Sequence, residues 1–110
     1  MSVILISMLI AIPRQALSIS GDDLVNYMLE SEKLTINDPN FLSAGIYYGY
    51  VYAAADVFRD TVAICPSNNV TRGQLVAVVT KYLKANPGKW DNSAISLVFN
   101  ALTDAFPCKK

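Results

Sequence analysis

The sequence contains no histidine, and this absence excludes several kinds of catalytic and metal site. Without an imidazole there is no Ser-His-Asp or Cys-His pair and no histidine acid–base step. The chain also has only two cysteines, which without neighbouring ligands do not form a zinc site. No glycine-rich phosphate loop is present. We therefore expect no metal site and no cofactor.

The sequence also lacks any run of like charge. Nine basic residues balance nine acidic ones over 110 residues, and both kinds are scattered along the chain. Nucleic acids and anionic membrane surfaces attract clustered lysine and arginine, so neither is an expected partner. Asp56 and Asp60 lie one helical turn apart, and paired carboxylates can act in acid–base catalysis. An enzyme is therefore an alternative, although such a pair is usually a solvated helix end.

Hydrophobic residues make up 53% of the chain, which is enough for the core of one small domain. The apolar run "VILISMLIAI" at residues 3–12 is too short to span a bilayer, and Ala16 and Ser18 follow as a small-x-small site. We predict a secretion signal over residues 1–18, a single domain over residues 19–110, and no stable membrane insertion after the signal is removed. The residues before the apolar run carry no lysine or arginine, which a secretion signal usually has there. A buried amino-terminal helix or strand is therefore an alternative.

The cysteines, Cys65 and Cys108, fit export. In an oxidising compartment an even number of cysteines in a small domain favours a disulfide. The chain-entropy treatment gives about 4 kcal/mol for closing a loop of this size. Two free, buried thiols are the alternative.

Four helices are predicted for the remaining chain, which makes the fold all-α. Ser20 is a candidate N-cap of the first helix, with Asp22 and Asp23 in its first turn. The second helix spans about residues 40–59, and we expect Gly45 and Gly49 to allow a tight crossing with another core helix. Its expected buried positions are Ile46, Tyr50, Ala53, Ala54 and Val57.

The third helix begins with Thr71 and Gln74 at capping-box spacing and ends before Pro87. Its apolar positions are Leu75, Val78, Val79, Tyr82 and Leu83. The fourth helix spans about residues 92–105, with apolar positions at Ala94, Leu97, Val98, Ala101, Leu102 and Ala105. We predict a bundle of about four helices in which a disulfide ties the start of the third helix to the end of the fourth. These ends are neighbours if the two helices form an antiparallel hairpin.

Three segments, "CPSNNVTRGQLVAVVTKYLKANP", "AISLVFNAL" and "AFPC", follow one another over residues 65–108. In this order they closely resemble the carboxy-terminal pattern of exported members of the Rap/Tai family of type VI secretion immunity proteins. "GYVYAAAD" and "SGDDLVNYM" extend the resemblance more loosely. Many members of that family have a further cysteine pair, at positions that look like Met28 and Tyr47 here, so apolar packing is expected to hold the first helix.

The resemblance implies a periplasmic immunity protein that binds a peptidoglycan amidase effector as its cognate toxin and blocks the active-site groove of that effector. It also implies an all-α fold, no enzymatic activity and a possible homodimer. A periplasmic structural or acid-stress chaperone-like protein without a toxin partner is the alternative function.

Two loops are the predicted partner-binding segments. They contribute Ser67, Asn68, Asn69, Lys89, Trp90 and Asp91. Tryptophan is enriched at interface hot spots, where truncation costs about 2 kcal/mol or more. Folding of Trp90 back onto the core is the alternative. A group of tyrosines on the second helix offers possible area for a second subunit: Tyr47, Tyr48, Tyr50 and Tyr52.

Overall fold

The computed structural model describes residues 18–33 and 40–109, and these ranges form four α-helices and one short 3-10 helix. The predicted all-α fold is confirmed, with helix ends close to those expected. The predicted secretion signal lies outside the described residues except for Ser18, and it stays a prediction. The elements are α2 (Gly21–Glu32), α3 (Phe41–Asp60), α4 (Arg72–Ala85), η3 (Pro87–Lys89) and α5 (Ala94–Ala105).

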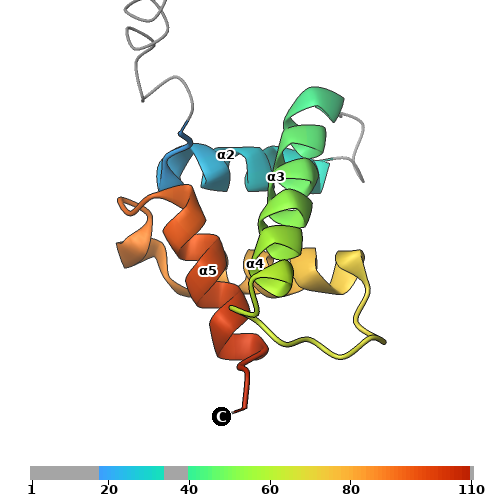
Figure 1. The fold of residues 1–110 in the computed structure, drawn as a ribbon. Coiled ribbons are helices and arrows are strands. Elements are labelled where there is room, and N and C mark those ends of the chain that lie inside the picture. Colours follow the sequence, from blue (N-terminus) through green and yellow to red (C-terminus); the bar gives the residue numbers. More distant parts are fainter. Residues whose placement is uncertain (1–17, 34–39, 110) are drawn as a thin grey trace, which may run out of the picture.

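The long helix α3 crosses both α2 and α4, and α5 lies against the same assembly (Figure 1). Each helix contributes one apolar side to a shared core between them. The burial of these side chains is the main force that holds the fold together. The largest fully buried side chains are Tyr47, Leu24, Met28, Ile64, Leu75, Leu83, Leu97, Leu102, Val51, Val79 and Val98.

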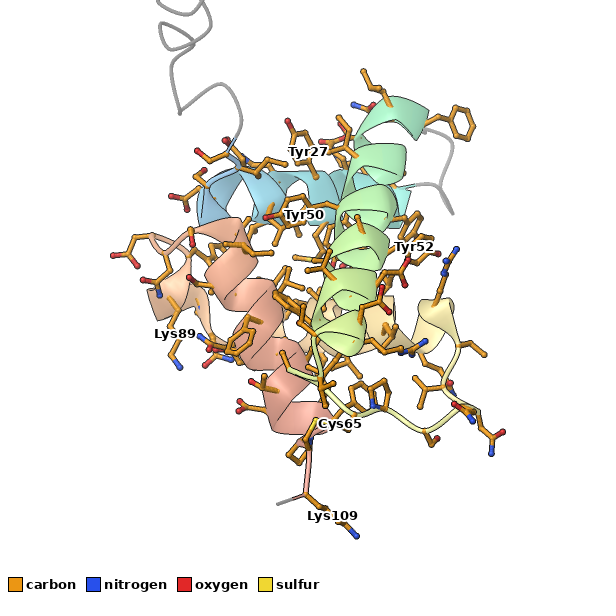
Figure 2. The ribbon with its side chains drawn as sticks, in the orientation of Figure 1. Tyr27, Tyr50, Tyr52, Cys65, Lys89 and Lys109 are labelled. Carbon is orange, nitrogen blue, oxygen red and sulfur yellow. A yellow bond between two sulfur atoms is a disulfide. The ribbon has the colours of Figure 1, made fainter. Side chains whose placement is uncertain are left out.

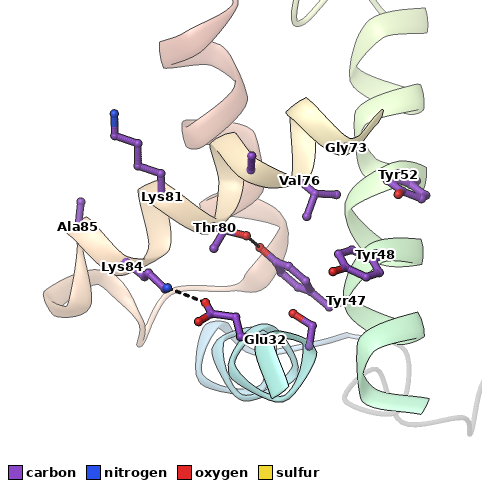
Figure 3. A pocket seen from close by; sticks show the side chains of 12 residues that line it. Glu32, Tyr47, Tyr48, Tyr52, Gly73, Val76, Thr80, Lys81, Lys84 and Ala85 are labelled. Carbon is purple, nitrogen blue, oxygen red and sulfur yellow. Dashed lines mark hydrogen bonds and ion pairs between the residues drawn. The ribbon is translucent and has the colours of Figure 1, made fainter. Parts of the chain in front are cut away.

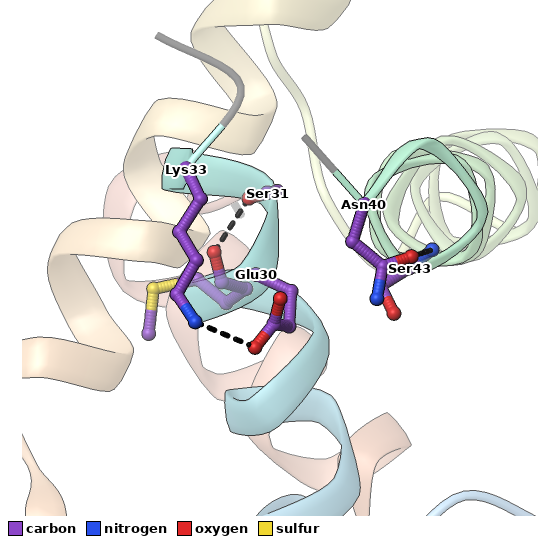
Figure 4. A network of polar contacts seen from close by, with 6 residues as sticks. Glu30, Ser31, Lys33, Asn40 and Ser43 are labelled. Carbon is purple, nitrogen blue, oxygen red and sulfur yellow. Dashed lines mark hydrogen bonds and ion pairs between the residues drawn. The ribbon is translucent and has the colours of Figure 1, made fainter. Parts of the chain in front are cut away.

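Side-chain caps fix where the helices begin. The Ser20 hydroxyl accepts a hydrogen bond from the Asp23 amide at 3.0 Å, as predicted. The capping box of α4 is complete, since the Gln74 amide donates to Thr71 at 3.1 Å and the Thr71 amide donates to the Gln74 side chain at 2.8 Å. Asn40 caps α3 by accepting from the Ser43 amide at 3.1 Å (Figure 4). These bonds satisfy amide groups that a helix start leaves unpaired.

The buried side of α3 differs from the predicted one. The structure buries Ala44, Tyr47, Val51, Ala54 and Ala55. Ala53 and Val57, both expected in the core, are exposed. Most positions of α3 are apolar, so helical periodicity alone does not select a side. The selection is made by the contacts of α3 with α2, α4 and α5.

The predicted tight crossing at Gly45 and Gly49 is wrong within the described chain. Both glycines are exposed, and a Cβ atom built on either would meet nothing within 4 Å. The glycines lie on the outward side of α3 because the bulky Tyr47 and Val51 occupy the side that faces the core.

The disulfide between Cys65 and Cys108 is present and joins positions separated by 43 in sequence. The Cys65 amide also donates a hydrogen bond to the Phe106 carbonyl at 2.9 Å, so backbone and side chains fasten the same two segments. The bond links the chain before α4 to the chain after α5, as predicted. However, α4 and α5 cross steeply and do not form an antiparallel hairpin (Figure 1).

The start of α2 docks on the turn between η3 and α5. Gly21 donates to the Asn92 carbonyl at 2.8 Å, and the Ala94 amide donates to the Ile19 carbonyl at 3.0 Å. Ser20 and Ser93 form an antiparallel bridge between these two bonds. This short pairing anchors the first described helix to the last one.

Val62, just after α3, adopts a left-handed backbone with a φ of 59°. This conformation is unfavourable for a β-branched residue and is the usual place of glycine after a helix. The Val62 side chain is 67% exposed, so it gains little from packing. We expect Val62→Gly to raise the free energy of unfolding by about 1 kcal/mol, measured by urea denaturation. A decrease would show that the valine side chain contributes packing that outweighs its backbone strain.

Candidate functional site

The two predicted partner-binding loops lie at opposite ends of α4. Ser67, Asn68 and Asn69 form an exposed turn before the helix, closed by a hydrogen bond from the Val70 amide to the Ser67 carbonyl at 3.1 Å. The other loop includes η3 and follows the helix. A helix of this length is about 20 Å long, so the structure does not bring the two loops together.

In the second loop, Trp90 is tied to the end of α4 while its neighbours face solvent. The Trp90 indole donates a hydrogen bond to the Leu83 carbonyl at 2.8 Å, and the ring packs against the core. Trp90 is half-buried, whereas Lys89 and Asp91 are exposed. The Lys89 ammonium group lies 5.8 Å from the centroid of the Tyr82 ring. The tryptophan therefore caps the helix, and the charged side chains of Lys89 and Asp91 beside it are more accessible to a partner.

A groove opens between α2, α3 and α4, and it was not predicted from the sequence (Figure 3). Its volume is about 1010 Å³, at the upper end of the range typical of ligand sites. Residues of α4 between Gly73 and Ala85 line it on one side, so the groove follows α4 for nearly its whole length, from one predicted loop toward the other. The only sequence signal for this surface was that α4 carries basic residues and no acidic ones.

Tyr47 holds the floor of the groove in place. Its hydroxyl group lies 2.7 Å from the Thr80 hydroxyl and forms a hydrogen bond across α3 and α4 (Figure 3). Burial raises the pKa of Tyr47 to about 12, because an ionised phenolate would be poorly solvated there. The phenol therefore stays neutral and hydrogen-bonded at physiological pH.

Alkaline pH is expected to destabilise the fold through Tyr47. The pKa of about 12 in the folded chain exceeds the ordinary value of 10.0, so the stability this group contributes is present below pH 10 and is lost as the pH rises toward 12. Urea denaturation across this range should show stability falling with pH more steeply in the wild type than in Tyr47→Phe. Equal slopes would show that Tyr47 ionises as readily in the folded chain as in the unfolded one.

Two tyrosines form an aromatic wall on the α3 side of the groove. The rings of Tyr48 and Tyr52 stack with centroids 6.3 Å apart, and both side chains are half-buried. The Arg72 guanidinium lies 5.5 Å from the Tyr52 ring centroid and 3.4 Å from an Asp56 carboxylate oxygen. Tyr50 points to another side of α3 (Figure 2), and burial raises its pKa. The four tyrosines considered as area for a second subunit are thus divided between core, groove and a separate face.

The α4 side of the groove is basic. Lys84 pairs with Glu32 of α2 at 2.6 Å, which links two of the helices that line the groove. Lys81 is exposed and extends away from the other lining side chains (Figure 3). Within the described residues Lys81 forms no ion pair, so its charge is available to a partner.

The chain was compared with known protein families. The model of the Rap1a immunity proteins matches residues 20–108, which includes all the helices described above. The chain belongs to the Rap1a immunity protein family. This agrees with the resemblance seen in the sequence. No curated protein and no solved structure matched the chain.

Membership of this family indicates a role in immunity toward a type VI effector and implies a cognate toxin as partner. Immunity proteins of this kind are not typically enzymes. Asp56 and Asp60, the pair that suggested an enzyme as an alternative, are both exposed, and Asp56 is paired with Arg72.

Met28 and Tyr47 are the positions at which the resemblance seen in the sequence indicates a further cysteine pair in many members of the family. Met28 and Tyr47 are both fully buried. Nearby, the end of α2 is fixed by the Ser31 hydroxyl, which donates to the Met28 carbonyl, and by an ion pair of 3.0 Å between Lys33 and Glu30 (Figure 4). Within the described residues, apolar packing holds α2 against α3.

The described part of this immunity protein has no helix long and apolar enough to cross a membrane. Within the same residues no three histidine, cysteine, aspartate or glutamate side chains gather to hold a metal ion. These findings concern residues 18–33 and 40–109 alone.

Proposed function

We propose that this chain is a periplasmic immunity protein that binds and inhibits a type VI secretion peptidoglycan amidase effector by blocking the active-site groove of that enzyme. The family match over residues 20–108 carries the proposal. The disulfide supports export to an oxidising compartment, because such bonds are rare in reducing ones. A scaffold tied at both ends of its helices suits tight inhibition, since a preorganised surface loses little entropy on binding.

The partner-binding residues remain a proposal: Ser67, Asn68, Asn69, Lys89, Trp90 and Asp91. All except Trp90 are exposed, and Trp90 is half-buried with its ring against the core. Trp90 also stabilises the end of α4, so its replacement is expected to change both folding and binding. Lys89→Glu and Asn68→Ala are better probes, because both side chains face solvent.

The test is calorimetric titration of the purified protein with the product of the neighbouring gene, inactivated at its nucleophile if it is an amidase. We expect one-to-one binding with a sub-micromolar Kd, and loss of amidase activity when the active enzyme is titrated. Binding without inhibition would contradict the blocking mechanism. Absence of binding would favour the structural or acid-stress chaperone-like alternative, for which protection of client proteins at low pH is the corresponding assay.

A homodimer is also proposed, and the outward side of α3 is where we expect it. This side carries the exposed small residues Gly45, Gly49 and Ala53, and the exposed apolar Leu42 lies on the same side. Helices approach closely over such small residues. Sedimentation should show a dimer in the wild type and a monomer in Gly49→Glu, and a wild-type monomer at all concentrations would reject the dimer.

A further inference from the structure

We propose that the groove between α2, α3 and α4 binds an acidic peptide segment that carries an aromatic or other bulky apolar side chain. The identity of the partner rests on the proposed function, so the segment would belong to the effector. The chemistry of the groove, its position along α4 and its charge each support this occupant.

The shape of the groove fits an extended segment of chain. It follows α4 from Gly73 to Ala85, and side chains of α2 and α3 line it opposite that helix (Figure 3). Small residues at Gly73 and Ala77 leave room on the helix surface, since a Cβ atom at Gly73 would meet only the Thr71 hydroxyl, at 3.9 Å. Because the groove runs from the Ser67–Asn69 turn toward the η3 loop, one bound segment would connect the two predicted loops.

The apolar part of the site is the stacked pair Tyr48 and Tyr52 together with Val76 on α4. Tyr48 and Tyr52 are held in place, because Tyr52 is covered by Arg72 and Tyr48 lies 5.9 Å from the buried Tyr47 ring. Rigid aromatic side chains of this kind lose little entropy on binding and commonly become hot spots. They favour an aromatic or bulky apolar side chain on the partner.

Charge selects an acidic segment. The helix α4 carries Arg72, Lys81 and Lys84 and no acidic residue. Lys84 is neutralised by Glu32 and Arg72 by Asp56, while Lys81 on the groove makes no ion pair within the described residues. An acidic group on the partner would pair with Lys81, whereas a basic one would be repelled.

The direct test uses the oxidised protein and a short fluorescein-labelled peptide in which aspartates flank a phenylalanine. A second peptide replaces these aspartates by lysines. Fluorescence anisotropy should show saturable binding of the acidic peptide and none of the basic one. Absence of binding by the acidic peptide, or equal binding of both, would overturn the proposal.

Three variants with the same change of charge locate the site. Lys81→Glu is expected to raise the Kd for the acidic peptide about tenfold, because one attraction becomes a repulsion. Lys109→Glu, at an exposed position well away from Tyr52 in Figure 2, should leave the Kd unchanged. Arg59→Glu should also leave it unchanged, because Arg59 is exposed and lies outside the groove. Equal weakening in all three would show diffuse attraction between charges and reject a groove site.

Lys81→Glu and a further variant, Tyr52→Ala, separate this inference from the proposed function. If the wild type binds the effector and Lys81→Glu and Tyr52→Ala bind it equally well, the effector docks elsewhere and only the groove proposal fails. If the wild type does not bind the effector but binds the acidic peptide through Lys81, the groove stands and the proposed function fails. If Tyr52→Ala abolishes self-association, a second copy occupies the groove and the peptide assignment is wrong.

Discussion

Gly21→Ala is expected to lower the free energy of unfolding by about 3 kcal/mol, which is the upper end of the usual effect of overpacking. A Cβ atom at this position would collide with the backbone carbonyl oxygens of Asn92 and Trp90 and lie 2.7 Å from a Leu97 methyl group. Backbone atoms cannot move aside as a flexible side chain can. The start of α2 would have to leave the turn before α5 and lose the hydrogen bonds that anchor it.

Urea denaturation followed by circular dichroism measures this effect, and Gly73→Ala is the matched control. Gly73 is also in the first turn of a helix, but a Cβ atom there makes only an ordinary contact. The control variant is expected to be as stable as the wild type or about 0.5 kcal/mol more stable, because alanine restricts the unfolded chain. A Gly21→Ala variant as stable as its control would show that α2 does not need this close approach.

Removal of the disulfide is the second change with a large expected effect. Cys65→Ala combined with Cys108→Ala should lower the free energy of unfolding by about 2–4 kcal/mol. The bond closes a long loop that contains α4 and α5, so its loss frees much of the unfolded chain. Total stabilities of small domains are about 5–15 kcal/mol, so the variant would retain only part of its stability.

Reduction of the wild type should give the same loss of stability, while the reducing agent should have no effect on the double variant. Urea denaturation is measured for the wild type and for the double variant, each with and without the reductant, and the four midpoints are compared. Agreement between the reduced wild type and the double variant would assign the effect to the covalent bond. An unchanged midpoint in both would show that the hydrogen bond from Cys65 to Phe106 and the core already hold these segments together.

The positions of Met28 and Tyr47 illustrate how this chain stabilises α2 without a second disulfide. Met28 fills the core from α2, and Tyr47 does so from α3 while its hydroxyl reaches Thr80 on α4. A single tyrosine therefore links the core to the groove. Its replacement would alter the fold and the groove together, whereas the exposed Lys81 allows the groove to be tested with the fold intact.

The amino-acid sequence by itself determined the helical class, the helix ends, the disulfide partners and the family. The helical class and the helix ends depend on local signals, such as the capping box of Thr71 and Gln74, the stop at Pro87 and the amphipathic pattern of α5. Such signals act within a few residues, so they can be recognised without knowledge of the surrounding structure. The signal peptide, the cognate effector and the partner-binding loops stay predictions.

Only the tertiary structure decided which side of α3 is buried, why Gly21 has to be glycine, and where the groove lies. Most positions of α3 are apolar, so burial was decided by the helices that cross it, and Gly45 and Gly49 were left outside. The groove joins side chains from three helices that are distant in sequence, including Glu32, Tyr48 and Lys81. A surface of this kind exists only after the helices have packed, because no single segment contains its shape or its charge.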